Sequence, residues 1–329
     1  MANAALSTPG IPMQPRGLEK KQTWLERLRK GDEVVHLITL SGAWSIIVIT
    51  GLLVQHLWVY SAIARHTFGW RFLFTSTWDP VNGLFGAWPF VYGTIVTSIL
   101  ALVIAIPIGL GTAIFLAELA PRKISDALTF LVELLAAVPS VIYGLVGIFL
   151  LIPILTTAMP YFQKVFGWLP IFSGTFYGVS YFSAAVILAI MVVPFIVSIS
   201  REVLLAVPVS QREAMMALGA TKWDVTWRAV VPYARQGIMG SIFLALARAL
   251  GETMAVTMVI GNVAQVSTSL LAPGYTIAAV IANEFTEATG DLYLHALIEL
   301  GLVLFAVTMI INALARLLML TMKGHEVTG

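Results

Sequence analysis

The stretch "SQREAMMALGATKWDVTWRAVVP", residues 210–232, is an island of charged and turn-forming residues in a strongly apolar chain. Of the 329 residues, 59% are hydrophobic and only 11% are charged, and the mean hydropathy is +0.90. Soluble domains carry about 25% charged residues, so this composition excludes an ordinary soluble protein and indicates an integral membrane protein. The chain contains no cysteine, which excludes disulfides and thiolate chemistry.

Six apolar runs around the island are long enough to cross a bilayer, which takes roughly 20 residues for each helix. They cover residues 37–62, 92–118, 127–155, 182–204, 236–261 and 292–320. We therefore expect an all-α integral membrane protein with six transmembrane helices. One transmembrane domain spans residues 37–320, between tails at 1–36 and 321–329. The first tail mixes apolar residues with many charges, which favours either a helix on the membrane surface or a solvated tail.

Lysine and arginine are distributed unequally over the loops, and short cytoplasmic loops retain the basic residues. With the N-terminus inside, only Arg65, Arg71 and Lys164 fall on the outer side. This predicts that both termini are cytoplasmic and that the island lies in a cytoplasmic loop of about residues 205–233, between the fourth and fifth spans. On the outer side, the apolar run at 269–285 is too short to cross, so we expect a re-entrant or interfacial helix there.

Helix-start and helix-stop signals punctuate the island. Ser210 and Glu213 have the S-x-x-E spacing of a capping box, which predicts that a helix starts there. Gly219 stands where a left-handed residue ends a helix. Thr221 and Asp224 repeat the capping pattern less strongly and predict a second helix.

The second helix of the island places Trp223 and Trp227 on one face, four residues apart, and Pro232 is expected to end it. The island is therefore expected to form two short helices joined by a sharp turn. About 30 residues of stiff structure is far more than the few residues that usually connect two helices, so we expect an element that docks onto a partner. A well-made connection without a partner is the alternative.

The island resembles the EAA motif, E-A-A-x3-G-x9-I-x-L-P, of permease subunits of ABC importers. The matching residues are Glu213, Ala214, Gly219 and Pro232. Met215, Ala229 and Val231 stand where the motif commonly has other small or apolar residues. In that family the motif fits a groove on the ATPase subunit, so the resemblance implies that a separate motor drives this loop. The residues to which the resemblance gives that coupling role are Glu213, Ala214, Gly219, Val231 and Pro232.

The chain has no G-x-x-x-x-G-K-[ST] phosphate loop, the sequence that cradles the phosphates of ATP in ATPases. We therefore expect ATP and Mg to bind a partner ATPase, with no cofactor and no enzymatic activity in this chain. Its five histidines are scattered, and neither a metal-ligand cluster nor a nucleophile arrangement is recognisable. We accordingly assign no catalytic and no metal-binding residue.

Arg248 and Glu252 lie inside the fifth predicted span, where a charge costs about 2.5–3.5 kcal/mol even on insertion scales. At i and i+4 they share a helix face and can form an ion pair, and Ser241 and Ala245 extend the same stripe. This pattern predicts a substrate pathway formed by Arg248, Glu252 and Ser241. Arg248 attracts an anion in transit and Glu252 keeps its binding weak, whereas a purely structural salt bridge is the alternative.

Two further acids, Glu133 and Glu299, fall alone within predicted spans. Charges inside a membrane usually face a bundle interior or a water-filled path. Without a nearby partner in the sequence, these two are weaker pathway candidates than Arg248.

Several segments, in family order, are similar to the permease subunits of phosphate ABC importers, and the last favours the PstC family over the paralogous PstA family. They are "FGAWPFVYGTIVTS", "GTAIFLAELAP", "AAVPSVIYGLVG", "RALGETMAVTMVIGN" and "APGYTIAAVIANEF". The resemblance implies a multi-pass protein of a bacterial or archaeal cytoplasmic membrane that forms half of a path for inorganic phosphate. It also implies a PstA-like second permease, a PstB-like ATPase dimer and a PstS-like phosphate-binding protein as partners.

Four alternatives stay open beside that resemblance. The chain is a PstA-type subunit or a permease for another oxyanion such as sulfate or molybdate, a secondary transporter or channel without an ATPase, a membrane enzyme, or a structural scaffold. The second leaves the docking element unexplained, the third lacks a catalytic arrangement, and the fourth does not account for Arg248.

Overall fold

A computed structural model describes residues 32–324 of the chain. The described residues are almost entirely helices and their connections, with two isolated β-bridges, Asp79–Leu84 and Gly261–Gly274. The chain divides into two compact units, Met1–Gln55 and His56–Gly329. The predicted surface helix of the N-terminal tail lies outside the described residues.

Six helical segments are long and apolar enough to cross a membrane, which confirms the predicted number of spans. They are Val34–Tyr60, Trp88–Leu119, Ser140–Phe166, Tyr181–Leu205, Lys222–Leu250 and Asp291–Leu317. The first belongs to α2 (Asp32–Tyr60), in which threonine and serine hydroxyls bond to carbonyls of the preceding turn, as in Thr50 to Ile46 at 2.8 Å. Such bonds satisfy polar side chains without water, as lipid requires.

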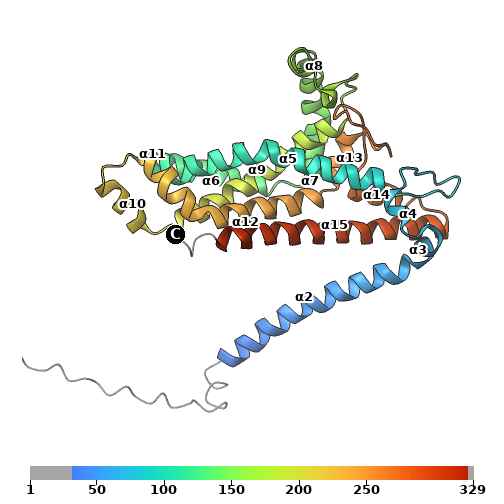
Figure 1. Cartoon of the computed structure of the whole chain (residues 1–329), viewed down its shortest axis with the longest axis horizontal. Coiled ribbons are helices and arrows are strands. Elements are labelled where there is room, and N and C mark those ends of the chain that lie inside the picture. Colours follow the sequence, from blue (N-terminus) through green and yellow to red (C-terminus); the bar gives the residue numbers. More distant parts are fainter. Residues whose placement is uncertain (1–31, 325–329) are drawn as a thin grey trace, which may run out of the picture. The chain divides into compact units, whose positions relative to one another are not determined.

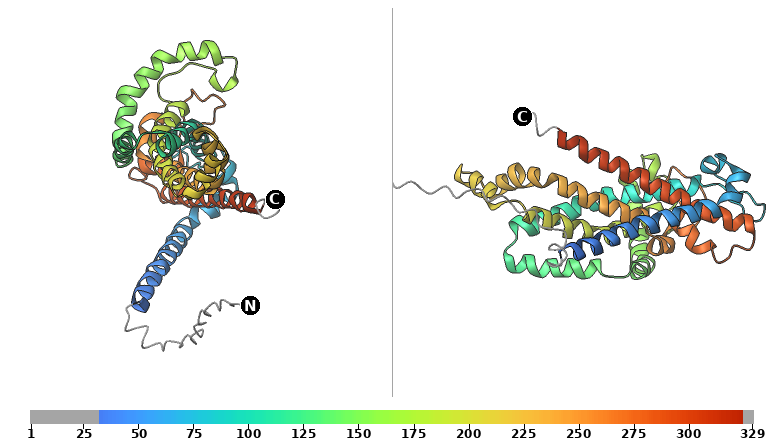
Figure 2. Two further views of the ribbon diagram at one scale, coloured as in Figure 1. Left: turned by 90° about the vertical axis from the view of Figure 1, so that its left-hand side faces the viewer. Right: turned by 90° about the horizontal axis from the view of Figure 1, so that it is seen from below.

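The second unit is built around α9 (Tyr181–Leu205), which is apolar over most of its circumference and mostly buried. It packs against α5 (Trp88–Ile114), α12 (Val231–Leu250) and α13 (Met254–Ile260), as Figures 1 and 2 show. Small residues allow these helices to approach closely. A Cβ atom on Gly109 of α5 would lie only 2.9 Å from Ile196 of α9, so this contact depends on glycine.

The expected third span at 127–155 was wrong, because this part of the chain is broken into pieces. α6 (Arg122–Ala136) ends before Pro139, since proline disfavours helical backbone in the residue that precedes it. A second, longer helical run then follows as α7 (Ser140–Val146), η2 (Gly147–Leu151) and α8 (Ile152–Phe166). Glu133 is an exposed residue of α6 and precedes the candidate span.

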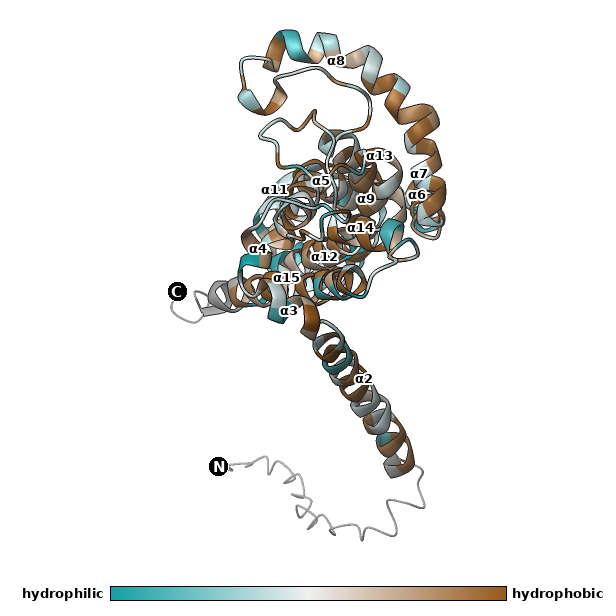
Figure 3. Ribbon diagram, turned by 90° about the vertical axis from the view of Figure 1, so that its right-hand side faces the viewer, coloured by the Kyte–Doolittle hydropathy of each residue, from teal (hydrophilic) through white to brown (hydrophobic). Residues whose placement is uncertain are grey.

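The two halves of this broken region follow different paths. α6 packs against α9, whereas α8 turns away from the bundle (Figures 1 and 2). In Figure 3 the run is apolar where it leaves α7 and becomes more hydrophilic toward the far end of α8. The residues of α8 therefore become more polar with distance from the bundle.

The short apolar run at residues 269–285 contains α14 (Ile277–Glu284), which supports the prediction of a short helix there. Ile277 and Ala279 are fully buried, and α14 packs against α5 and against α15 (Asp291–Gly324). Thr276 caps the helix by accepting a hydrogen bond from the backbone of Ala279. Protein rather than lipid therefore covers the start of this helix.

The fifth span also differs from the prediction. α11 (Lys222–Val225), the π-helical turn η4 (Thr226–Val230) and α12 form one helical run, so Pro232 does not end a helix but lies in the first turn of α12. Proline cannot donate the usual bond within a helix, and the wider π-helical turn directly before it accommodates that missing donor. The run ends at Leu250 rather than near residue 261.

Candidate functional site

The island at residues 210–232 forms most of α10 (Val209–Ala217), a sharp turn, and the start of the α11–α12 run. α10 begins after Pro208, and no side chain caps it, so the predicted capping box of Ser210 and Glu213 was wrong. The reason is register: Pro208 occupies the N-cap position, which places Ser210 already inside the first turn. Gly219 has φ +83°, which confirms the predicted left-handed residue.

The second capping box is present. The Thr221 side chain accepts a hydrogen bond from the Asp224 amide at 3.2 Å, and the Asp224 carboxylate accepts one from the Thr221 amide at 3.3 Å. This reciprocal pair satisfies two backbone donors at a helix start. Trp223 and Trp227 then lie on one face, with ring centroids 5.5 Å apart, as predicted.

A groove of about 400 Å³ separates α10 from the start of α12. Its lining includes Ala214 and Pro232, which are distant in sequence but belong to the same motif. Glu213 and Gly219 are exposed outside this lining, and Val231 is half-buried. Leu218, at the turn, is 84% exposed. An exposed apolar tip beside a groove lined by both apolar and charged residues is suited to docking against another protein.

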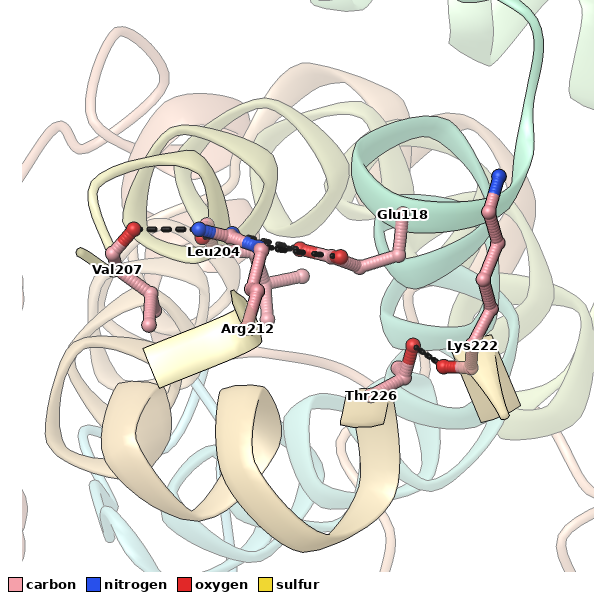
Figure 4. Close-up of polar contacts among 6 residues, drawn as sticks. All are labelled: Glu118, Leu204, Val207, Arg212, Lys222 and Thr226. Atoms are coloured by element: carbon pink, nitrogen blue, oxygen red, sulfur yellow. Dashed lines mark hydrogen bonds and ion pairs between the residues drawn. The ribbon is translucent and has the colours of Figure 1, made fainter. Parts of the chain in front are cut away.

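Arg212 of α10 and Glu118 of η1 (Phe115–Leu119) form an ion pair that the sequence analysis missed (Figure 4). Arg212 Nη2 lies 2.7 Å from Glu118 Oε1, and the two side chains are only 16% and 10% exposed. Arg212 also donates to the backbone carbonyls of Leu204 and Val207 near the end of α9. The available signal was an isolated acid at the end of the second predicted span and an arginine in the loop between the fourth and fifth spans.

The predicted ion pair of Arg248 and Glu252 is not formed. Arg248 lies in the last turn of α12, which ends at Leu250, and Glu252 lies beyond the helix. Residues at i and i+4 face each other only while the helix continues, so the break separates them. The Glu252 carboxylate instead accepts a hydrogen bond from the amide of Ala255 in α13, at 3.3 Å.

Arg248 has an unusual environment for a cation inside a candidate span. Its guanidinium carbon lies 4.3 Å from the ring centroid of Phe195 on α9. Its Nε is buried and has no hydrogen-bond partner among residues 32–324. A cation–π contact compensates part of the desolvation, whereas an unpaired buried donor remains costly.

The stripe that was expected to extend from Arg248 is largely a packing surface. Ser241 and Ala245 are fully buried, and Ser241 Oγ lies 2.7 Å from Ser200 Oγ on α9. Glu299 of α15 is also buried, and its Oε2 has no partner in the described part of the chain. Arg248 therefore joins a positive charge to an unsatisfied donor. Arg201 of α9 also has a buried Nε without a partner among the described residues, but its guanidinium pairs with Glu202 at 2.9 Å, which makes Arg248 the stronger candidate.

Comparison with known proteins identifies relatives of this chain. A family model described as "Binding-protein-dependent transport system inner membrane component" matches residues 105–323. A protein of Mesorhizobium japonicum named phosphate transport system permease protein PstC is 46% identical over 316 residues, which cover 94% of this chain and 97% of that protein. A Xylella fastidiosa protein of the same name is 45% identical over 295 residues, 88% of this chain and 90% of its own length.

Solved structures share the fold at low sequence identity. A bacterial alginate ABC transporter in complex with its pentasaccharide-bound periplasmic protein contains a chain that is 14% identical, with a TM-score of 0.54 over 89% of this chain and 96% of that one. A bacterial ABC transporter involved in alginate import gives a TM-score of 0.52 at 15% identity, over 90% of this chain and 99% of that one.

Proposed function

Because this chain belongs to the family of binding-protein-dependent transport system inner membrane components, we propose that it forms half of the translocation path of an ATP-driven phosphate importer. It is a multi-pass permease subunit of the bacterial cytoplasmic membrane. The observation that carries the substrate class is Arg248, a cation within a candidate span whose buried Nε lacks a partner in the described chain. Relatives named as phosphate permeases match nearly the whole chain and narrow the anion to phosphate.

In this proposal the α10–α11 element docks on a separate ATPase. Its small and apolar residues are exposed, and Ala214 and Pro232 line one groove. The sequence has no phosphate loop, so ATP and Mg belong to the partner. A PstB-like ATPase dimer, a PstA-like second permease and a PstS-like binding protein complete the assembly. Glu213, Gly219 and Val231 shape the docking element through their places at its surface and turn.

The pathway is proposed to pass the break between α12 and α13. Arg248 offers a cation to a passing phosphate, and Glu252, just beyond the end of α12, keeps binding weak enough for release. A site that bound phosphate tightly would slow its exit. Ser241 contributes indirectly: its buried hydroxyl shares a hydrogen bond with Ser200 and so holds α12 against α9.

Transport is then alternating access. ATP binding closes the two ATPases, which draws the docking elements together, and the membrane helices respond by opening the path toward the binding protein. A ligand shifts such an equilibrium only as far as it favours one state over the other. Hydrolysis resets the path toward the cytoplasm.

Reconstitution with the cognate ATPase, second permease and binding protein tests this function. We expect uptake of labelled phosphate that requires ATP and exceeds uptake of labelled sulfate. Uptake that persists without ATP or without the ATPase contradicts the importer mechanism. Preference for sulfate contradicts the substrate but leaves the ATP-driven mechanism in place.

A Glu252→Gln variant tests the release role in the same vesicles. We expect slower uptake in a fully assembled complex, because removal of the negative charge strengthens retention of the anion at Arg248. Unchanged uptake contradicts a pathway role for Glu252.

A further inference from the structure

α10 is weakly attached to the rest of the protein by packing. Among its residues none is fully buried, and no side chain caps its start. Half-buried Met215 packs against the cluster of apolar residues formed by the inner ends of α5, α9 and α12. A nine-residue helix with so little burial is not held in position by the hydrophobic effect alone.

The guanidinium of Arg212 supplies the missing attachment. It donates to both carboxylate oxygens of Glu118, with Nε at 3.3 Å from each and Nη2 at 2.7 Å from Oε1. Nη2 also donates to the Leu204 carbonyl at 2.8 Å, and Nη1 donates to Val207. One side chain therefore joins α10, the α5–η1 end and the α9 end (Figure 4).

The electrostatics of the two helix ends favour this arrangement. The last carbonyls of a helix lack intrahelical donors and carry partial negative charge, which a cation stabilises. Glu118 adds a full negative charge at the end of the α5–η1 run, where the helix dipole disfavours it. Arg212 compensates all three acceptors at once, so each helix end depends on the same guanidinium.

Stability alone does not explain a pair this buried. Desolvation of two charges offsets much of their attraction, and apolar residues of similar size often serve equally well for stability. The planar fork of arginine instead fixes direction, because its donors must point at several acceptors together. The pair therefore defines the relative position of three helices more sharply than packing does.

The chain itself connects the docking element rigidly to α12 but not to α9 or α5. α11 continues through η4 into α12 as one helical run, so a displacement of α11 reaches α12 directly. Between α9 and α10, by contrast, the helix is interrupted at Ala206–Pro208. α5 is far from α10 in sequence, and the ion pair with Arg212 reaches Glu118 in η1, directly after α5.

We infer that the Arg212–Glu118 ion pair stays closed through the transport cycle and makes α10 move as one body with the inner ends of α5 and α9. Arg212 and Glu118 are then positioning residues that carry displacement from the docking element into the membrane. This inference rests on the proposed function. It adds a second route of transmission to the direct α11–α12 connection.

Arg212→Lys and Glu118→Gln test the inference in the reconstituted complex. Both preserve size, but the first loses the fork and the second loses the charge. We expect normal assembly and continued ATP hydrolysis, with phosphate imported per ATP reduced at least about tenfold. The reason is that disruption of a buried pair costs more than the 1.4 kcal/mol equivalent to a factor of ten.

The matched control is Glu202→Gln, which removes a carboxylate from the same end of α9. Glu202 pairs with its neighbour Arg201 at 2.9 Å but is 69% exposed, and an exposed pair contributes little. We expect transport per ATP to be unchanged. An unchanged ratio in Arg212→Lys and Glu118→Gln overturns the inference, and so does failure of both variants to assemble, which would assign the pair to docking.

A covalent link distinguishes a permanent joint from a latch that opens. This chain has no native cysteine, so Glu118→Cys with Arg212→Cys introduces its only two thiols. We expect a short thiol-specific cross-linker to raise transport per ATP above that of the unlinked double variant. Loss of transport on cross-linking shows that the pair must open and overturns the inference. Failure of the unmodified complex to import phosphate contradicts the proposed function instead.

Discussion

Arg212 and Arg248 are two largely enclosed arginines of the second unit with opposite environments. Arg212 donates to a carboxylate and to two backbone carbonyls at the C-terminal ends of the α5–η1 run and of α9. Arg248 lies over the ring of Phe195, and its buried Nε has no partner within the described range. All three nitrogens of the first guanidinium donate to its own chain, whereas Nε of the second has no acceptor among the described residues.

This difference teaches what each cation is suited to do. An unpaired buried polar group costs about 1–3 kcal/mol, and a charged one costs more, so proteins keep such groups where they serve a function. An arginine whose three nitrogens all donate to its own chain is poorly available to a ligand and suits a mechanical joint. An unsaturated arginine within a span suits an anion that arrives and leaves.

Arg248→Gln removes the arginine that has an unpartnered donor, and it should have the largest effect on phosphate uptake. We expect phosphate uptake to fall roughly 10- to 100-fold, because hydrogen bonds to charged groups contribute about 1.5–3 kcal/mol. Assembly of the complex, measured by co-purification, should be retained. Arg248→Lys keeps the charge without the fork and should be impaired less. If both variants fail to assemble, the result supports a structural role of Arg248 and contradicts the pathway role.

Gly219→Val tests the turn of the docking element, with an intermediate effect. A Cβ at Gly219 meets no atom within 4 Å, so the substitution acts through backbone strain at φ +83°. That strain is about 1–3 kcal/mol for a residue other than glycine. We expect less ATPase to co-purify and uptake to fall with it. Gly219→Asn, which tolerates this conformation, should be milder; equal effects would assign the defect to the side chain.

Thr221→Ala and Ser210→Ala compare the starts of the two helices of the docking element, and their effects should be the smallest. Of these two residues, only Thr221 caps a helix in the structure. Loss of the Thr221 cap should lower hydrogen-exchange protection of the α11 amides about fivefold, which corresponds to ~1 kcal/mol. Ser210→Ala should leave protection of α10 within about 0.5 kcal/mol. A larger effect of Ser210→Ala would indicate that Ser210 caps α10 after all, in contrast to the structure.

The accuracy of prediction differed along the chain for identifiable reasons. Hydropathy found six spans, because each helix must bury its backbone polar groups in lipid over a known length. It misplaced the third and fifth, where the structure treats Pro139 and Pro232 differently. A π-helical turn accommodates Pro232, whereas the chain bends before Pro139. Hydropathy averages over such turns and does not detect them.

What the sequence determined by itself was local or set by the solvent. The membrane location, the number of spans, the left-handed Gly219 and the Thr221–Asp224 cap follow from composition or from contacts within a few residues. The tertiary structure alone decided that Glu118 meets Arg212 and that Arg248 does not meet Glu252. The first pair joins residues far apart in sequence, and the second depended on a helix that ends at Leu250. Charges pair where the folded backbone brings them together, and sequence spacing predicts that only while a single helix continues.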